Sequence, residues 1–204
     1  IEKGINDCTE QEVAEMLQQR ENVLQSQLHE QQMHLQGLQN LRVALRLCEQ
    51  GEWSVRTVPD VWYLPHTIGK EFVQDSRICD QLPQWLDWMP VVTSAQIVRG
   101  NDAHAERMEW GLGLEQAEAA QLGFAPQEPA QLLHLGRVLE IYCSWEIPAE
   151  HGSEKGLYQY CMERARALNL VPEPVMFRRV FCYTEKGGTK QVHNVLRVPV
   201  KMAE

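Results

Sequence analysis

Apolar residues repeat every seven positions along the first quarter of the chain. The repeat begins after Thr9, which forms with Glu12 the capping-box pattern that satisfies free N–H groups at a helix start. No proline interrupts the stretch before about Cys48. The heptad positions are Leu17, Leu24, Gln31, Leu38 and Leu45, and Leu28 and Leu35 supply the second apolar position. This period predicts a helix over residues 9–50, roughly 60 Å long, whose seam packs against a second copy in a homodimer.

Two charged residues in the seam indicate how the copies are oriented. Glu21 and Arg42 occupy the heptad position that is otherwise held by Leu28 and Leu35, and Gln31 lies near the midpoint. In an antiparallel pair centred there, Glu21 of one chain lies roughly opposite Arg42 of the other, which favours this orientation. The alternative is that both side chains extend to solvent and contribute little.

Charge and composition exclude several classes of protein. The net charge of −9 argues against nucleic-acid binding by these residues, because a duplex binder needs clustered lysine and arginine. The six cysteines are scattered without CxxC or CxxH spacing, so we expect reduced thiols and no metal or other cofactor. No run of 18 apolar residues and no signal-peptide pattern is present, so we expect a cytoplasmic protein without a membrane anchor.

The remaining residues contain the same order of elements twice. In the first block, residues 53–66 read as extended with a turn at Pro59-Asp60, 76–89 as helical, and 94–99 and 107–115 as strands. In the second, residues 132–146 read as extended, 153–168 as helical, and 175–183 and 191–200 as strands joined by a hairpin at Gly187-Gly188.

This repetition predicts the fold class. We expect an α+β protein in which a long N-terminal coiled-coil helix precedes a duplicated strand–helix–strand–strand domain over residues 52–204. The two modules would span about 52–125 and 130–204 and form a joint antiparallel sheet. A ligand cleft is expected between the halves, where binding sites tend to lie.

Several stretches, in this order, resemble the C-terminal part of a MerR-family transcription regulator with a GyrI-like effector-binding domain. They are Ile1-Glu2-Lys3-Gly4-Ile5 through Leu45 with Glu15-Met16-Leu17 at its front, Trp62-Tyr63-Leu64-Pro65-His66-Thr67-Ile68-Gly69, Phe177-Arg178-Arg179-Val180-Phe181, and Val198-Pro199-Val200-Lys201. The resemblance covers essentially the whole chain, and the order of the elements is its main basis.

The resemblance implies a ligand-sensing regulator rather than an enzyme. Residues 1–8 would be the remnant of a removed N-terminal winged-helix domain, and promoter DNA would be contacted only through that absent domain. The helix over 9–50 would form an antiparallel dimer, and the domain over 52–204 would bind a small hydrophobic or aromatic effector. Ligand binding would then shift the dimer between two arrangements.

Aromatic and charged residues on the predicted strands are the candidate ligand contacts. Aromatic side chains offer large contact area for flat apolar molecules, although a strand aromatic is more often part of the core. The candidates are Tyr63, Trp110, Glu140, Tyr142, Trp145, Arg179, Phe181 and Tyr183.

Arg179 departs from the pattern that the resemblance implies. Multidrug-sensing members carry a buried glutamate two residues before an aromatic on this strand, where the chain has Arg179 and Phe181. An unpartnered arginine would repel cations and bind a carboxylate, phosphate or phenolate, so we expect anionic or neutral aromatic ligands. The alternative is that Arg179 pairs internally with Glu140 or Glu109 and leaves a neutral pocket.

Two other functions stay open at this stage. Some GyrI-like domains are hydrolases that act on small aromatic or electrophilic compounds in the same cleft, and Glu140, Glu109 or Glu146 could serve as the general base. The other is an interaction scaffold, which would need no cleft.

Overall fold

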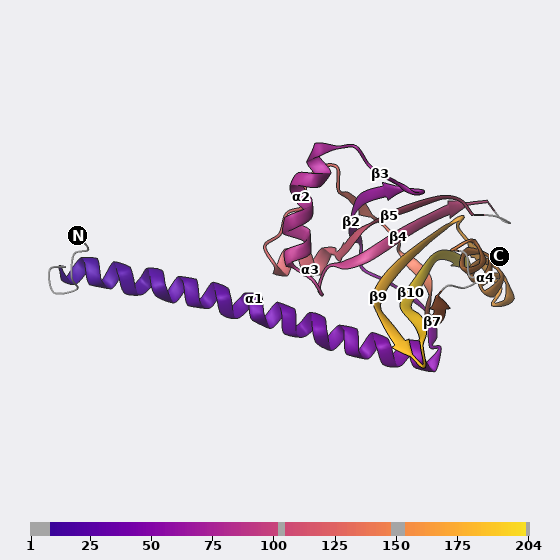
Figure 1. The fold of residues 1–204 in the computed structure, drawn as a ribbon, viewed down its shortest axis with the longest axis horizontal. Helices are drawn as coiled ribbons and strands as arrows, with labels where there is room; N and C mark the ends of the chain where they lie inside the picture. The colour runs from indigo at the N-terminus through magenta and orange to yellow at the C-terminus, as the bar shows by residue number, and fades with distance from the viewer. Residues whose placement is uncertain (1–8, 102–104, 148–153, 203–204) are drawn as a thin grey trace.

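The long helix expected from the heptads is present. In the computed structural model, which describes residues 9–101, 105–147 and 154–202, α1 spans Glu10–Gln50 (Figure 1). Thr9 N donates to Glu12 Oε2 at 2.7 Å and Glu12 N donates to Thr9 Oγ1 at 3.3 Å, so the predicted capping box is confirmed. The helix ends where Gly51 adopts the left-handed conformation with φ of 65°. The expected remnant over residues 1–8 lies outside the described residues.

Only part of α1 is free of the domain. The heptads predicted packing against a second copy but did not predict that the helix also packs against its own domain. Its C-terminal part packs on the sheet through the buried residues Met33, Gly37, Ala44 and Cys48. The N-terminal part projects beyond the domain (Figure 1). Of the seam positions, Leu17, Leu24, Leu28, Gln31, Leu35 and Leu38 are exposed, whereas Leu45 is half-buried.

The order strand–helix–strand–strand occurs twice along the chain, and we call the two stretches module one and module two. Module one contains β1 (Trp53–Thr57), β2 (Val61–Ile68), β3 (Glu71–Phe72), α2 (Ser76–Asp87), β4 (Thr93–Gly100), β5 (Ala105–Glu115) and α3 (Gln116–Gln121). Module two contains β6 (Gln131–Leu133), β7 (Arg137–Ile147), α4 (Glu154–Ala167), β8 (Leu170–Pro172), β9 (Val175–Lys186) and β10 (Thr189–Met202). The short elements β3, α3 and β8, and the break between β6 and β7, were not predicted.

The strands form one antiparallel sheet in the order β1-β7-β10-β9-β4-β5-β2-β3, with β6 beside β2 and β8 beside β10. Each module contributes three central strands in mirrored order, β9-β10-β7 and β4-β5-β2, so β9 and β4 join the modules at the centre. In addition, β1 of module one pairs with β7, and β6 of module two pairs with β2, so each module adds a strand to the half of the sheet formed by the other. Their register places Ala95 opposite Arg179 and Ile97 opposite Phe177. The joint sheet and the α+β class expected from the sequence are therefore confirmed.

The two faces of the sheet carry different partners because side chains alternate along a strand. On one face α4 packs over a core that includes Leu139, Leu196 and Val198, and α2 packs over Leu64, Leu112 and Leu114. The opposite face carries a second core around Tyr63, Phe177 and Val138, and α1 closes it on the module-two side. No helix in the described part of the chain is long and apolar enough to cross a membrane.

Candidate ligand-binding pocket

A cavity of about 280 Å³ lies between α1 and the sheet, where the two modules meet. One wall is the C-terminal part of α1, a second is residues 89–93 with Glu115 and Glu118, and the third is the inner face of β7, β9 and β10. The main lining residues are Gly37, Leu41, Val43, Ala44, Leu47, Arg56, Val91, Thr93, Glu115, Glu118, Tyr142, Arg179, Phe181, Val195 and Arg197. The cleft expected between the halves therefore has α1 as an additional wall.

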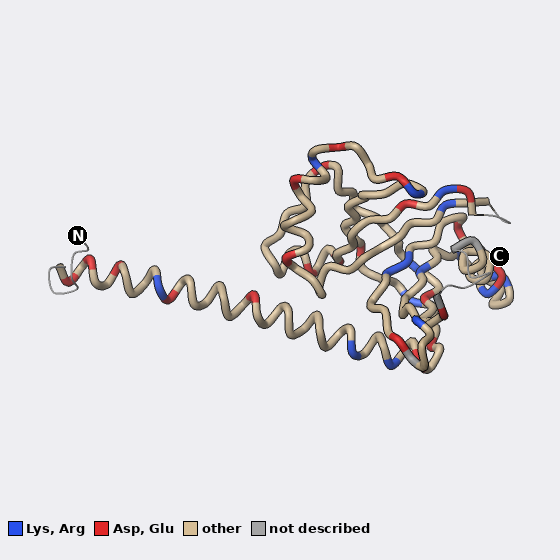
Figure 2. The backbone as a smooth tube through the Cα atoms, in the orientation of Figure 1, with Lys and Arg blue, Asp and Glu red and all other residues tan. Residues whose placement is uncertain are grey.

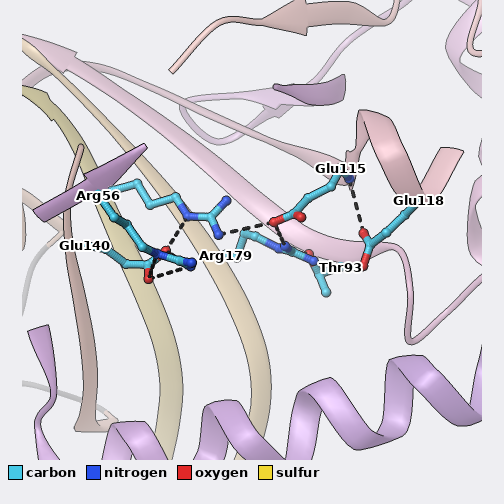
Figure 3. Close-up of polar contacts among 7 residues, drawn as sticks. Arg56, Thr93, Glu115, Glu118, Glu140 and Arg179 are labelled. Carbon is cyan, nitrogen blue, oxygen red and sulfur yellow. Dashed lines mark hydrogen bonds and ion pairs between the residues drawn. The ribbon is translucent and has the colours of Figure 1, made fainter. Parts of the chain in front are cut away.

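Five alternating charges, which we call the charged row, cross the strands at this cavity (Figure 3). Arg56 Nε donates to Glu140 Oε1 at 2.8 Å, and Arg197 Nε donates to Glu140 Oε2 at 2.8 Å. Arg197 Nη2 and Arg179 Nη1 both donate to Glu115 Oε1, at 3.2 and 2.9 Å. Arg179 Nε also donates to Thr93 Oγ1 at 3.0 Å. Ion pairs thus link the two modules across the central strands.

The two carboxyl groups at either end of the pocket have opposite pKa shifts. Burial alone would raise the pKa of Glu140, but the hydrogen bonds and charges of Arg56 and Arg197 hold it below its usual value. Burial raises the pKa of Glu118, which accepts a hydrogen bond from the backbone N–H of Glu115 and has no arginine in hydrogen-bond contact among the described residues. The arginines of the charged row thus favour the charged form of Glu140, whereas burial favours the neutral form of Glu118.

The rest of the pocket wall is apolar. Tyr142 and Phe181 lie nearly parallel, with ring centroids 6.4 Å apart and an interplanar angle of 12°. Opposite the strands, α1 presents Leu41, Val43 and Leu47. A ligand that fits here has an apolar body against these side chains and a polar group at the charged row. In the described residues, no group of three or more His, Cys, Asp or Glu side chains could hold a metal ion.

Four of the eight candidate ligand contacts lie at the pocket. Tyr142, Arg179 and Phe181 line it, and Glu140 lies behind Arg56 and Arg197. The expectation of an unpartnered Arg179 is wrong, because its guanidinium donates to Glu115 and Thr93. The internal-pairing alternative is the one the structure shows, although the partner is Glu115 and neither Glu140 nor Glu109.

The other four candidates lie elsewhere. Tyr63 is fully buried in the core, where its hydroxyl donates to the backbone carbonyl of Glu109 and its ring meets Phe177 edge-on. Trp110 and Trp145 lie on the opposite face of the sheet, where they sandwich the guanidinium of Arg178 at 5.1 and 4.7 Å. Tyr183 is 60% exposed near the end of β9, beyond the cavity. The alternation of side chains along β5 and β7 places the two tryptophans on the far face, whereas Tyr63 is on the face of the pocket but is buried in the core there.

Sequence reasoning missed most of the polar pocket residues. Arg56, Thr93, Glu115, Glu118 and Arg197 were not proposed, nor was the contribution of α1 to the wall. One pattern could have indicated Arg197, because a charge in the otherwise apolar run Val195–Val200 needs a buried partner. Figure 2 shows basic positions gathered where β9 and β10 cross the middle of the domain, while α1 bears only scattered charges.

Comparisons with known proteins add the following. No protein-family model matches the chain, and no curated protein matches it. Among solved structures, the chain is similar to the crystal structure of the EcmrR C-terminal domain, with 9% identity, a TM-score of 0.45, and coverage of 75% of this chain and 99% of that one. It is also similar to EcmrR in a cryo-EM structure of an EcmrR–DNA complex, with 12% identity, a TM-score of 0.40, and coverage of 93% and 72%.

Proposed function

We propose that this chain is the effector-sensing part of a MerR-type transcription regulator. A small hydrophobic or aromatic molecule binds the cavity between α1 and the sheet. The seam of α1 pairs with a second copy in an antiparallel dimer, and the dimer transmits ligand binding to a DNA-binding domain on the N-terminal side of α1.

The observation that carries this proposal is that one helix supplies both the pocket wall and the unpartnered seam. Ala44 and Leu47 line the cavity. On the same helix Leu35 and Leu38 are more than half exposed. A ligand in the cavity therefore touches the element through which two copies would associate, and a difference in helix position between free and bound states is a direct way to couple the two sites.

A hydrolase acting in the same pocket is the second candidate, and Glu118 is the observation that favours it. Its raised pKa suits a general base better than the lowered pKa of Glu140. Of the other bases considered, Glu109 pairs with Arg107 away from the pocket lining, and Glu146 is exposed. The candidate predicts turnover of small aromatic esters that is lost in Glu118→Gln.

The pocket assignment is tested by ligand binding with a blocked cavity. A panel of one- and two-ring aromatic molecules is titrated by calorimetry, and thermal unfolding is followed with each. We expect members of the panel to bind and raise Tm, and Val43→Trp to weaken binding at least about tenfold by filling space at the pocket wall.

Val23→Trp is the matched control, because Val23 is a similarly exposed valine of α1 that does not line the cavity. It should bind the panel like the unmodified protein. Equal binding by the Val43→Trp and Val23→Trp variants would place the ligand outside this cavity, and ester turnover in the absence of any Tm shift would favour the hydrolase.

A further inference from the structure

One arginine of the charged row has a donor that nothing in the described chain accepts. Arg197 is 4% exposed, and its Nε and Nη2 donate to Glu140 and Glu115. Its Nη1 is buried and has no hydrogen-bond partner among the described residues. Buried donors of charged groups are nearly always satisfied in native proteins, so this nitrogen indicates an acceptor from outside the chain.

We infer that the pocket binds a hydrophobic monoanion, such as an aromatic carboxylate, whose anionic group accepts a hydrogen bond from Arg197 Nη1. This inference rests on the proposed function, since it names the chemical class of the effector of the same pocket. It assigns ligand charge selection to Arg197, in place of the unpartnered Arg179 expected from the sequence.

The charge count of the pocket supports an anion. The charged row contains three arginines and two glutamates, and both oxygens of Glu140 are already hydrogen-bonded. Glu118 is the only further carboxyl group in the pocket lining, and burial favours its neutral form. The wall thus offers more donors than acceptors, and a ligand carboxylate complements this excess whereas a cation does not.

The apolar part of the wall defines the rest of the ligand. Tyr142, Phe181, Leu41 and Val91 line the same cavity as Arg197. A cavity of about 280 Å³ lies at the lower end of the usual range for small-molecule sites, so a one- or two-ring body fits it. An anionic group at Arg197 and a flat body against Tyr142 and Phe181 satisfy both halves of the pocket.

Three probes of nearly the same shape and different charge test the inference. They are 2-naphthoate, 2-naphthamide and 2-naphthamidinium, which carry a planar anionic, neutral or cationic group on one ring system. Calorimetric titration into the full chain is expected to show naphthoate binding about tenfold or more tighter than the amide, and the amidinium weakest.

Two variants assign the preference to Arg197. Arg197→Lys keeps the positive charge but lacks the planar guanidinium group that donates to Glu140, Glu115 and the ligand at the same time. The affinity for naphthoate should therefore fall about tenfold, while the affinity for naphthamide changes little. Arg197→Lys could also disturb the buried charged row, so Glu118→Gln is the second variant. It leaves the charged row intact, and because burial already favours the neutral form of Glu118, the preference for naphthoate over amidinium should be kept. Arg107→Gln, which removes a charge outside the pocket lining, is the control.

The outcomes separate this inference from the proposed function. Amide or amidinium binding as tight as naphthoate, or a naphthoate preference unchanged in Arg197→Lys, means that Nη1 is satisfied by water alone and overturns the inference, while the pocket stands. If none of the three probes binds but other members of the aromatic panel do, the monoanion is wrong and the effector site remains. If nothing binds at all, both fail.

Discussion

Arg178 and Arg179 are neighbours in the sequence and serve opposite faces of the sheet. Arg178 lies between Trp110 and Trp145, and its Nε donates to the side-chain oxygen of Asn194 at 2.8 Å. Arg179 belongs to the charged row at the pocket. Adjacent side chains of a strand point to opposite faces of the sheet, so a one-residue shift in register would exchange the environments of the two arginines. The tryptophans predicted as ligand contacts instead hold an arginine of their own chain.

Glu140 should make the fold sensitive to acid. Its folded-state pKa lies below the usual carboxyl value, so its stabilisation is present above the unfolded pKa of about 4.3 and is lost as pH falls through the folded pKa. Glu140→Gln should lower the free energy of unfolding by about 3–5 kcal/mol at pH 7, since it leaves Arg197 buried with a broken pair. Urea unfolding from pH 7 to pH 3 should show this difference shrinking below about pH 4.

Glu118 should behave with the opposite sign. Burial raises its folded-state pKa, so its contribution is most favourable below the unfolded pKa and is lost as pH rises through the folded pKa. Glu118→Gln should therefore gain stability relative to the unmodified protein as pH increases, with little difference in acid. The same urea series measures it, and parallel pH profiles of the two proteins would contradict the assignment.

At the scale of elements, the sequence predicted the regular parts of the fold and missed the short ones. Heptads, the capping box and period-two alternation predicted α1, α2, α4 and the long strands, because these signals are local. The strand β8 depends on pairing with the distant strand β10, while β3 forms a local hairpin with β2 and α3 is a single short helix; all three are too short to show a periodic pattern. Of the eight candidate ligand contacts, four lie at the pocket. The sequence shows which residues are aromatic or charged, but it does not show which face of the sheet each side chain occupies.

Gly111 is required by the packing of β5 against β2. A Cβ atom there would overlap the backbone oxygen of Leu64 and lie 2.7 Å from the ring of Tyr63. Gly111→Ala should therefore lower the free energy of unfolding by about 1–3 kcal/mol or more, since backbone and a buried ring must both move. Gly113→Ala, whose Cβ would lie 3.1 Å from Ala95 Cβ, should cost less. Denaturant unfolding at one protein concentration compares them.

At the scale of the whole molecule, the seam of α1 should make the protein a dimer. The exposed leucines recur along the seam, and burying each fully contributes roughly 1.5–3 kcal/mol. Leu17→Glu with Leu24→Glu places two charges on the projecting part of the helix, so the dimer should dissociate while the domain stays folded. Light scattering after gel filtration gives the mass, and circular dichroism reports the fold.

Gln18→Glu with Gln25→Glu adds the same two charges at exposed positions one residue further along, outside the seam. This control should remain a dimer. If the leucine and glutamine variants have the same mass, the seam does not join two copies. Substitution is preferable to deleting α1, because residues 33–48 of the helix cover the sheet and form a pocket wall.

Because α1 is a single continuous helix from Glu10 to Gln50, the pocket wall and the seam are parts of the same element. Under the proposed function, the factor by which a bound effector changes the dissociation constant of the dimer must equal the factor by which dimerisation changes the affinity for the effector. The fraction of the protein that holds effector would then depend on the protein concentration as well as on the effector concentration. Two cells with the same effector level and different amounts of this protein would hold it in different states.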